Sequence, residues 1–458
     1  MKKSAWHASA TRSTPSSLFR AGQGLCALLV LGLLIGLGTA TTWAANKRWL
    51  VQFRPDTPPE VQEAIVAQSD SKVLQRFPSL NAMALKLPAH PGMALAMLQS
   101  APEVVAVEED AAITVPALPA EGGSQGLILP SLPGSNVYPW NLVEIHHDQI
   151  PLAIRGKGVT VAVLDTGIDP VHPAFGSGIR IEGGYNARAG ENPDDWIDRN
   201  GHGTHIAGII IASQQGQGVL GVAYKARLYA VKVLNDAGGG YLSDLIAGLL
   251  WIYAHPEKGI RVINMSLGFY QDSPLLHEVI RRLYQEGIVL VASVGNYDCG
   301  IPASEGGDSI GATSEGGDSE GGDSEGGDSG LDCTWQVKYP AQYPETIAVG
   351  ATDETGSVTS YSVQGPAVDV VAPGGTRTAP ILSTYLGSGF GLGSGTSQAA
   401  AHVSGVAALL LEVNPALGPQ EVRQILQETA TDLGEPWEVQ GAGLVDAEWA
   451  VEVAGDWP

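Results

Sequence analysis

The sequence predicts an α/β protein with a doubly wound, mostly parallel sheet, preceded by a small α+β domain. From about residue 138, short apolar runs rich in β-branched residues alternate with helical patterns. Such alternation is typical of a parallel sheet that is buried under helices on both faces. Before it, residues 46–113 show a βαββαβ-like, ferredoxin-like order. The larger domain should carry its functional site at the carboxyl ends of the sheet strands.

Hydrophobic periodicity defines the individual elements. The small domain is expected to have strands at 49–53, 82–87 and 104–110 and helices at 59–69 and 92–100. The large domain is expected to have strands at 159–164, 228–233, 262–266, 288–293, 347–350 and 368–372. Its expected helices are 203–213, 243–255, 275–286, 398–412 and 419–429.

Residues 1–44 have the pattern of an export signal. A basic, Ser/Thr-rich start precedes an apolar run, and small residues follow at the cleavage position. The alternative is an uncleaved segment that anchors the protein to a membrane, outside the cytoplasm. Residues 114–137 are rich in Pro, Gly, Ser and Leu, which predicts a cleavable linker.

Charge and cysteine content narrow the class of protein. Lys and Arg number 25 and Asp and Glu number 48, so the net charge is −23. That charge argues against a nucleic-acid partner. Once the signal with Cys26 is removed, Cys299 and Cys333 remain, and in an exported protein they are expected to form one disulfide. Two free buried thiols are the alternative.

The segment 305–329 is an acidic insertion. It contains four copies of Glu-Gly-Gly-Asp-Ser, and no aromatic or branched residue occurs inside the repeated unit. Such a unit cannot bury enough surface to fold alone, so a disordered acidic loop is expected. Weak calcium binding by its carboxylates is the alternative, although the spacing lacks a known calcium-repeat pattern.

Three chemically distinctive residues lie where strands meet loops or helix starts. Asp165 ends an apolar strand, His202 begins a helical pattern, and Ser397 precedes an alanine-rich helix. A serine hydroxyl is a poor nucleophile until an imidazole takes its proton, and a carboxylate must orient that imidazole. The order Asp, His, Ser is one of the known chain orders for such a triad. Asn296, in Ser293-Val-Gly-Asn, is a fourth candidate.

Together these segments resemble the motifs of the subtilisin-like serine peptidases, the subtilase family. The resemblance covers most of the chain from about residue 140 to 450. It implies that Ser397 is the nucleophile, His202 the base and Asp165 the orienting acid, with Asn296 as an oxyanion donor. His205 is expected to pack in the core.

The resemblance also divides the chain into domains. Residues 45–113 are similar to the family's inhibitor-type propeptide, which assists folding and then occupies the active site. Residues 138–458 correspond to the peptidase domain. The alternative is an ordinary N-terminal domain that is retained after maturation.

Substrate strands usually bind such clefts by main-chain pairing. The matching segments here are Gly238-Gly239-Gly240 and Ser266-Leu267-Gly268, with Ser293 and Gly295 beside the oxyanion asparagine. Lys338 aligns with a small residue at the floor of the primary specificity pocket. An inward ammonium would favour Glu or Asp before the scissile bond. In the alternative, the lysine stem runs outward to solvent.

No cofactor is required for this chemistry, and the metal content is left open. The family often has an aspartate nine residues after the triad acid as a ligand of a tight calcium site. Here that residue is Ala174, and the loop before Gly221 carries no carboxylate. Calcium prefers several charged or carbonyl oxygens, so the usual structural site should be weakened or lost.

The sequence therefore predicts a secreted serine endopeptidase, made as a self-processing zymogen. Its partners would be protein or peptide substrates and its own propeptide as an intramolecular inhibitor, and a monomer is expected. A restricted processing peptidase and a catalytically silent binding scaffold are the alternatives. Four intact candidate residues argue against the scaffold.

Overall fold

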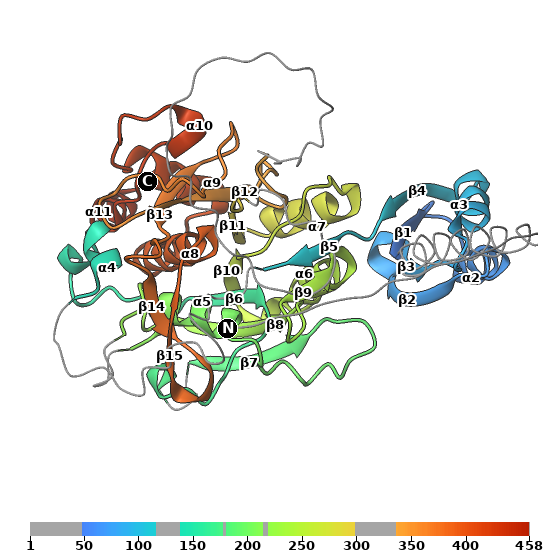
Figure 1. Ribbon diagram of the computed structural model, residues 1–458, viewed down its shortest axis with the longest axis horizontal. Helices are drawn as coiled ribbons and strands as arrows, with labels where there is room; N and C mark the ends of the chain where they lie inside the picture. Colours follow the sequence, from blue (N-terminus) through green and yellow to red (C-terminus); the bar gives the residue numbers. More distant parts are fainter. Residues whose placement is uncertain (1–47, 116–137, 177–179, 214–218, 298–335, 458) are drawn as a thin grey trace, which may run out of the picture.

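A computed structural model describes residues 48–115, 138–176, 180–213, 219–297 and 336–457 (Figure 1). The large domain is built on seven parallel strands in the order β13-β12-β11-β10-β6-β8-β7. The first strand in sequence, β6, lies inside the sheet between β10 and β8. The strands are β6 (Thr160–Asp165), β7 (Ile181–Asn186), β8 (Arg227–Lys232), β10 (Ile260–Met265), β11 (Val289–Ser293), β12 (Thr346–Thr352) and β13 (Val370–Pro373).

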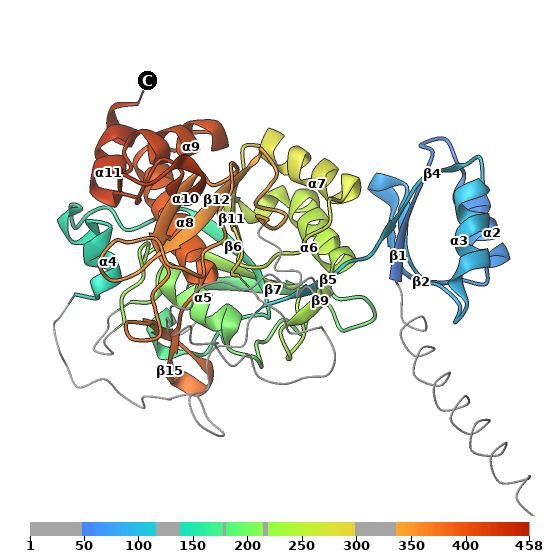
Figure 2. The ribbon, with the colours of Figure 1, turned by 45° about the horizontal axis from the view of Figure 1, so that its top comes forward.

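Helices cover both faces of this sheet. On one face α5 packs against α8, and on the other α6 packs against α7 and lies toward the N-terminal domain (Figures 1 and 2). The helices are α4 (Trp140–Glu144), α5 (His202–Ile211), α6 (Leu242–Ala254), α7 (Pro274–Gln285), α8 (Thr396–Val413), α9 (Pro419–Glu428), α10 (Trp437–Gln440) and α11 (Ala447–Asp456). Two further strands, β14 (Ile381–Thr384) and β15 (Phe390–Gly393), form an antiparallel hairpin.

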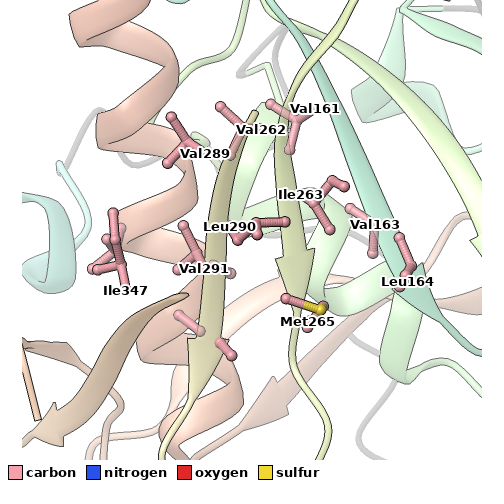
Figure 3. Packing of buried hydrophobic residues seen from close by; sticks show 14 of the residues in the cluster. Val161, Val163, Leu164, Val262, Ile263, Met265, Val289, Leu290, Val291 and Ile347 are labelled. Atoms are coloured by element: carbon pink, nitrogen blue, oxygen red, sulfur yellow. The ribbon is translucent and has the colours of Figure 1, made fainter. Parts of the chain in front are cut away.

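The sheet core consists of the apolar runs that predicted the strands. Side chains of β6, β10 and β11, among them Val163, Ile263 and Leu290, are buried and lie together in Figure 3. All six predicted strands of this domain are present. The seventh, β7, escaped prediction because Gly183 and Gly184 interrupt its apolar pattern. A Cβ at Gly184 would lie 2.2 Å from the Trp196 ring, so the indole needs this glycine.

The N-terminal domain has the βαββαβ order. Its antiparallel sheet runs β2-β3-β1-β4, and α2 and α3 lie on the face away from the large domain (Figure 2). The elements are β1 (Arg48–Phe53), α2 (Pro59–Gln68), β2 (Lys72–Phe77), β3 (Ala82–Lys86), α3 (Pro91–Ser100) and β4 (Val104–Glu109). Strand β2 was not assigned from the sequence.

Alternating residues give the N-terminal sheet two buried faces. Val51, Met83 and Leu85 pack with the domain's own helices. Leu50 and Ala84 instead belong to the hydrophobic cluster of the large domain. The two domains therefore share a continuous apolar contact. Beyond β4 the chain runs into β5 (Ala112–Thr114), which pairs with β9 (Gly239–Tyr241) of the large domain.

Candidate active site

Asp165 and His202 form a buried hydrogen-bonded pair at the carboxyl edge of the sheet. Asp165 is the last residue of β6 and His202 the first of α5, and both are nearly inaccessible to solvent. His202 Nδ1 lies 2.9 Å from each carboxylate oxygen. Because a carboxylate only accepts, the geometry assigns the proton to Nδ1 and leaves Nε2 as an acceptor.

A glycine next to the histidine allows this pairing. Gly203 packs against the turn that follows Asp165, and a Cβ at Gly203 would lie 2.1 Å from Gly167 O. Only a residue without a side chain lets α5 begin so close to β6. The Gly after His202 in the sequence motif is therefore a packing requirement of the pair.

The electrostatic surroundings change the pKa of His202. Burial by itself lowers the pKa of His202, but the Asp165 carboxylate, its hydrogen bond and the nearby charge of Asp198 outweigh burial and raise the pKa. His205, one turn along α5, is different. Burial and the neighbouring His202 lower its pKa to about 3, and its Nε2 lies 3.2 Å from the carbonyl oxygens of Ile381 and Gly391. His205 thus packs in the core, as predicted.

Ser397 is the second residue of α8 and is 4% exposed. Its hydroxyl donates to Ser266 O at 3.3 Å, while the Ser266 hydroxyl donates to Ser397 O at 2.8 Å. His202 Nε2 is buried and has no hydrogen-bond partner among the described residues. The serine-to-histidine hydrogen bond is therefore not formed in this structure, although α5 and α8 pack together and the imidazole acceptor is free.

Asn296 lies beside the start of the same helix. Its Oδ1 accepts hydrogen bonds from the Thr396 amide and hydroxyl, both at 3.0 Å. This contact fixes the orientation of the side-chain amide, with Nδ2 near the backbone of Gly395. Nδ2 and the Ser397 N–H are thus two donors at the N-terminus of α8, where the helix dipole also favours negative charge.

A second buried carboxylate, Asp198, organises the start of α5 and was missed in the sequence. Its Oδ1 accepts from the Thr166 hydroxyl and from two backbone amides, those of Asn200 and Gly201. Its Oδ2 accepts from the amide and hydroxyl of Thr204. An acid shortly before a helical pattern is a capping signal that could have identified it.

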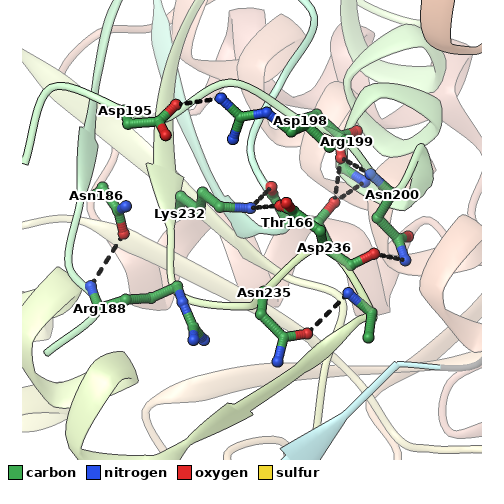
Figure 4. Close-up of polar contacts among 12 residues, drawn as sticks. Thr166, Asn186, Arg188, Asp195, Asp198, Arg199, Asn200, Lys232, Asn235 and Asp236 are labelled. Carbon is green, nitrogen blue, oxygen red and sulfur yellow. Dashed lines mark hydrogen bonds and ion pairs between the residues drawn. The ribbon is translucent and has the colours of Figure 1, made fainter. Parts of the chain in front are cut away.

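Figure 4 shows how this network continues away from α5. Lys232 Nζ donates to Thr166 O at 2.5 Å and pairs with Asp236 at 3.0 Å. Asn200 Nδ2 in turn donates to Asp236 O at 3.2 Å. The turn after Asp165 is therefore tied to the loop that leads into β9.

Part of the chain itself lies between the two predicted substrate-binding segments. On one side β5 pairs antiparallel with β9, placing Ile113 opposite Gly240 and Thr114 opposite Gly239, and the Val115 amide donates to Gly238 O at 3.0 Å. On the other side Thr114 forms an antiparallel bridge with Gly268. The segment 112–115 is thus the middle of three adjacent strands, and its backbone groups are paired on both of its edges, as in β-strand addition. The predicted 113/114 domain boundary falls inside this paired segment.

Comparisons with known proteins agree with this geometry. The sequence profile of the subtilase family matches residues 156–444. Subtilisin Savinase from Lederbergia lenta is 37% identical over 316 residues, covering 68% of this chain and 98% of that protein. The thermostable alkaline protease from Halalkalibacterium halodurans is 33% identical over 427 residues, covering 93% and 98%.

This chain belongs to the subtilase family of serine endopeptidases. A further relative, the minor extracellular protease Epr from Bacillus subtilis, is 32% identical over 384 residues, covering 83% of this chain and 51% of that protein. The doubly wound sheet and the position of the site at its carboxyl edge agree with the family assignment.

In this subtilase the stem of Lys338 lies between two glycines of the predicted substrate-binding set. A Cβ at Gly268 would be 2.8 Å from Lys338 Cβ, and one at Gly295 would be 2.8 Å from Lys338 Cδ. The ammonium lies over the Tyr270 ring, 4.9 Å from its centroid. Backbone hydrogen bonds of Lys338 to Val294 and of Tyr339 to Phe269 hold the segment in place. The lysine therefore belongs to the wall formed by the ends of β10 and β11.

The side chains of three other predicted substrate-binding residues are buried. Ser266 is 0%, Leu267 is 2% and Ser293 is 3% exposed, so their side chains are part of the protein interior. Several other predictions lie outside the described residues: the signal segment 1–44, residues 116–137 of the linker, the insertion 305–329, and Cys299 with Cys333. None of the helices in the described ranges is both long and apolar enough to cross a bilayer.

Proposed function

We propose that this subtilase hydrolyses peptide bonds with Ser397 as nucleophile. His202 Nε2 takes the hydroxyl proton as Ser397 attacks the carbonyl carbon, and later gives a proton to the leaving amine. Asp165 holds the imidazole tautomer and stabilises its charged form. The observation that carries this proposal is the buried Asp165–His202 pair, whose free Nε2 belongs to a helix packed against the one that bears Ser397.

Negative charge on the carbonyl oxygen would be stabilised by Asn296 Nδ2 and the Ser397 N–H. Both donors are groups of the protein. Every step of the proposed hydrolysis is therefore carried out by a protein group and needs no cofactor. Losing one such donor costs about 2.7–4 kcal/mol of transition-state stabilisation.

The chemistry is tested with a chromogenic peptide and the mature enzyme. Ser397→Ala should abolish turnover above background, and Asn296→Ala should lower kcat about 100- to 1,000-fold with little change in KM. Circular dichroism and the melting temperature of both variants serve as controls for folding. Full activity of folded Ser397→Ala would refute the assignment.

The N-terminal domain is proposed to be an inhibitory propeptide. Its continuation, Ala112–Val115, already lies in the cleft as a strand between Gly239 and Gly268. A peptide bound in this way excludes substrate from the same backbone groups. The alignment with the Halalkalibacterium halodurans protease, at 427 residues, is also too long to be confined to the peptidase domain.

Carboxylates of the N-terminal domain are placed at the N-termini of two peptidase helices. Asp110 accepts from the amide and hydroxyl of Ser243 at the start of α6, and it pairs with Arg48 at 2.7 Å. Glu108 accepts from the hydroxyl of Ser273, the N-cap of α7, at 2.8 Å. Such contacts favour a docked domain, because they give acceptors to donor groups at the starts of the two helices.

For specificity we propose a preference for Glu or Asp before the scissile bond. The support is Lys338, whose stem packs between Gly268 and Gly295. A peptidase with this preference would process a restricted set of substrates, and Glu121 in the linker would be a candidate position for self-cleavage.

We further propose secretion after removal of residues 1–44, with an N-terminal anchor as the alternative. The name of the Bacillus subtilis relative, an extracellular protease, supports export. The Cys299–Cys333 disulfide, the monomeric state and the lack of a nucleic-acid partner stay predictions from composition and spacing.

A further inference from the structure

Four oxygen atoms from three segments of the chain converge where α5 ends. Three are the backbone carbonyls of Ala174, Ile211 and Tyr224, and the fourth is the hydroxyl of Ser213. Ala174 lies in the short 3₁₀ turn Pro173–Phe175. A concentration of oxygen acceptors like this one requires either a cation or several donors.

The guanidinium of Arg180 supplies both the positive charge and the hydrogen-bond donors. Nη1 donates to Ile211 O at 2.9 Å and also to Tyr224 O. Nη2 donates to Ala174 O at 2.9 Å and to the Ser213 hydroxyl at 2.7 Å. The planar fork of an arginine, with its fixed donors, suits this task better than the single ammonium of a lysine.

Among the described residues, oxygen dipoles balance the charge of Arg180. In the part of the chain that the structure describes, no carboxylate pairs with it, and burial lowers its pKa. An arginine stays protonated nonetheless. A partly buried cation without an anionic partner is unfavourable unless its donors are satisfied, so the surrounding oxygens are essential to this arrangement.

These residues do not fit calcium. The resemblance placed a tight calcium site on Ala174 and the loop before Gly221. Calcium takes six to eight oxygens and prefers carboxylates among them. The side chain of Ala174 has no oxygen atom. The carbonyls of Ala174, Ile211 and Tyr224 already accept from the guanidinium of Arg180, whose charge would repel a second cation.

We propose that Arg180 is a built-in cation which replaces structural calcium in this subtilase. It joins the Pro173–Phe175 turn, the end of α5 and the segment before β8. Because α5 begins with His202, the same contacts stabilise the helix that carries the general base. The stability of the peptidase domain should therefore depend on Arg180 and be insensitive to chelators.

The test is thermal unfolding of the full chain in a Ser397→Ala background, which prevents self-digestion. Arg180→Gln removes the charge and the guanidinium donors to the carbonyls of Ile211 and Tyr224, while Ala174 O keeps the amide and hydroxyl of Ser213. We expect its melting temperature to fall by about 5 °C or more, equally in millimolar calcium and in EGTA. Arg227→Gln is the matched control, because Arg227 is 42% exposed and pairs with Glu182 at the surface. Its melting temperature should change by less than about 1 °C.

The background protein without either arginine substitution supplies the second measurement. Its melting temperature should differ by no more than about 2 °C between calcium and EGTA. A chelator-induced fall of about 10 °C would overturn the proposal, and this comparison remains decisive if Arg180→Gln fails to fold. The proposal also fails if Arg180→Gln is as stable as Arg227→Gln.

Discussion

The hydroxyl of Thr166 donates a hydrogen bond to Asp198 at 2.9 Å, and this bond joins the turn after Asp165 to the start of α5, the helix that begins with His202. The same hydroxyl accepts from the Gly203 amide at 3.0 Å. Asp198 thus acts as a positioning residue: it holds both sides of the Asp165–His202 pair and contributes negative charge near the imidazole.

We predict that Asp198→Asn lowers kcat/KM by about 10- to 100-fold, because small displacements of catalytic groups are costly. Removing the charge should also lower the pKa of His202. Since the base must be neutral to act, the acidic limb of the pH profile of kcat/KM should move to lower pH. Asp195→Asn, an exposed acid of the same loop that pairs with Arg199, is the control. An unshifted acidic limb in Asp198→Asn would argue against its electrostatic role.

A second prediction concerns Lys338. The wild-type enzyme should cleave peptides with Glu before the scissile bond about 10-fold better than those with Gln, and salt should weaken this preference. Lys338→Met keeps the stem between Gly268 and Gly295 but removes the charge, so it should cleave the two peptides equally. The measurement is kcat/KM for the matched pair of peptides. Equal cleavage by the wild type would place the ammonium outside the pocket.

The contact between the domains should respond to pH through Glu108. Burial outweighs the hydrogen bonds from Ser273 and Leu275 and, with Asp272 and Asp110 nearby, raises the pKa of Glu108 to about 7. A carboxyl with a raised pKa favours the docked state when it is protonated. The docked state should therefore be most stable below about pH 4.5 and weaken as the pH rises through 7.

Hydrogen exchange of the Ile113–Val115 amides in full-length Ser397→Ala measures this docking. After correction for the intrinsic rate, exchange should be faster at pH 8.5 than at pH 5.5. Adding Glu108→Gln should remove the difference, whereas Glu60→Gln, on the outer helix α2, should keep it. Protection that is equal at both pH values in the Ser397→Ala protein would contradict the expected pH response.

The sequence pattern predicted those strands whose residues are apolar because the strand itself is buried. Strand β6 is a continuous apolar run, so its end and the position of Asp165 at the sheet edge followed from the sequence. Strand β7 did not, because Gly184 leaves room for the Trp196 ring and Gly183 lies against Tyr229, and only the folded chain brings these rings to the strand.

The missed site residues depend on contacts between distant segments. Asp198 draws its donors from the turn after β6 and from α5 as well as from its own loop. Arg180 finds its acceptors in three other segments of the chain. A motif search recognises neither residue, since their roles arise only when these segments meet.

Intact mass of the secreted protein, compared with that of Ser397→Ala, tests the central claim most directly. If Ser397 is the nucleophile of a self-processing zymogen, the wild type loses the N-terminal domain and the variant retains it. The new N-terminus would also identify the residue that the specificity pocket accepts. Cleavage of both proteins at one position, or of neither, would contradict self-processing by Ser397.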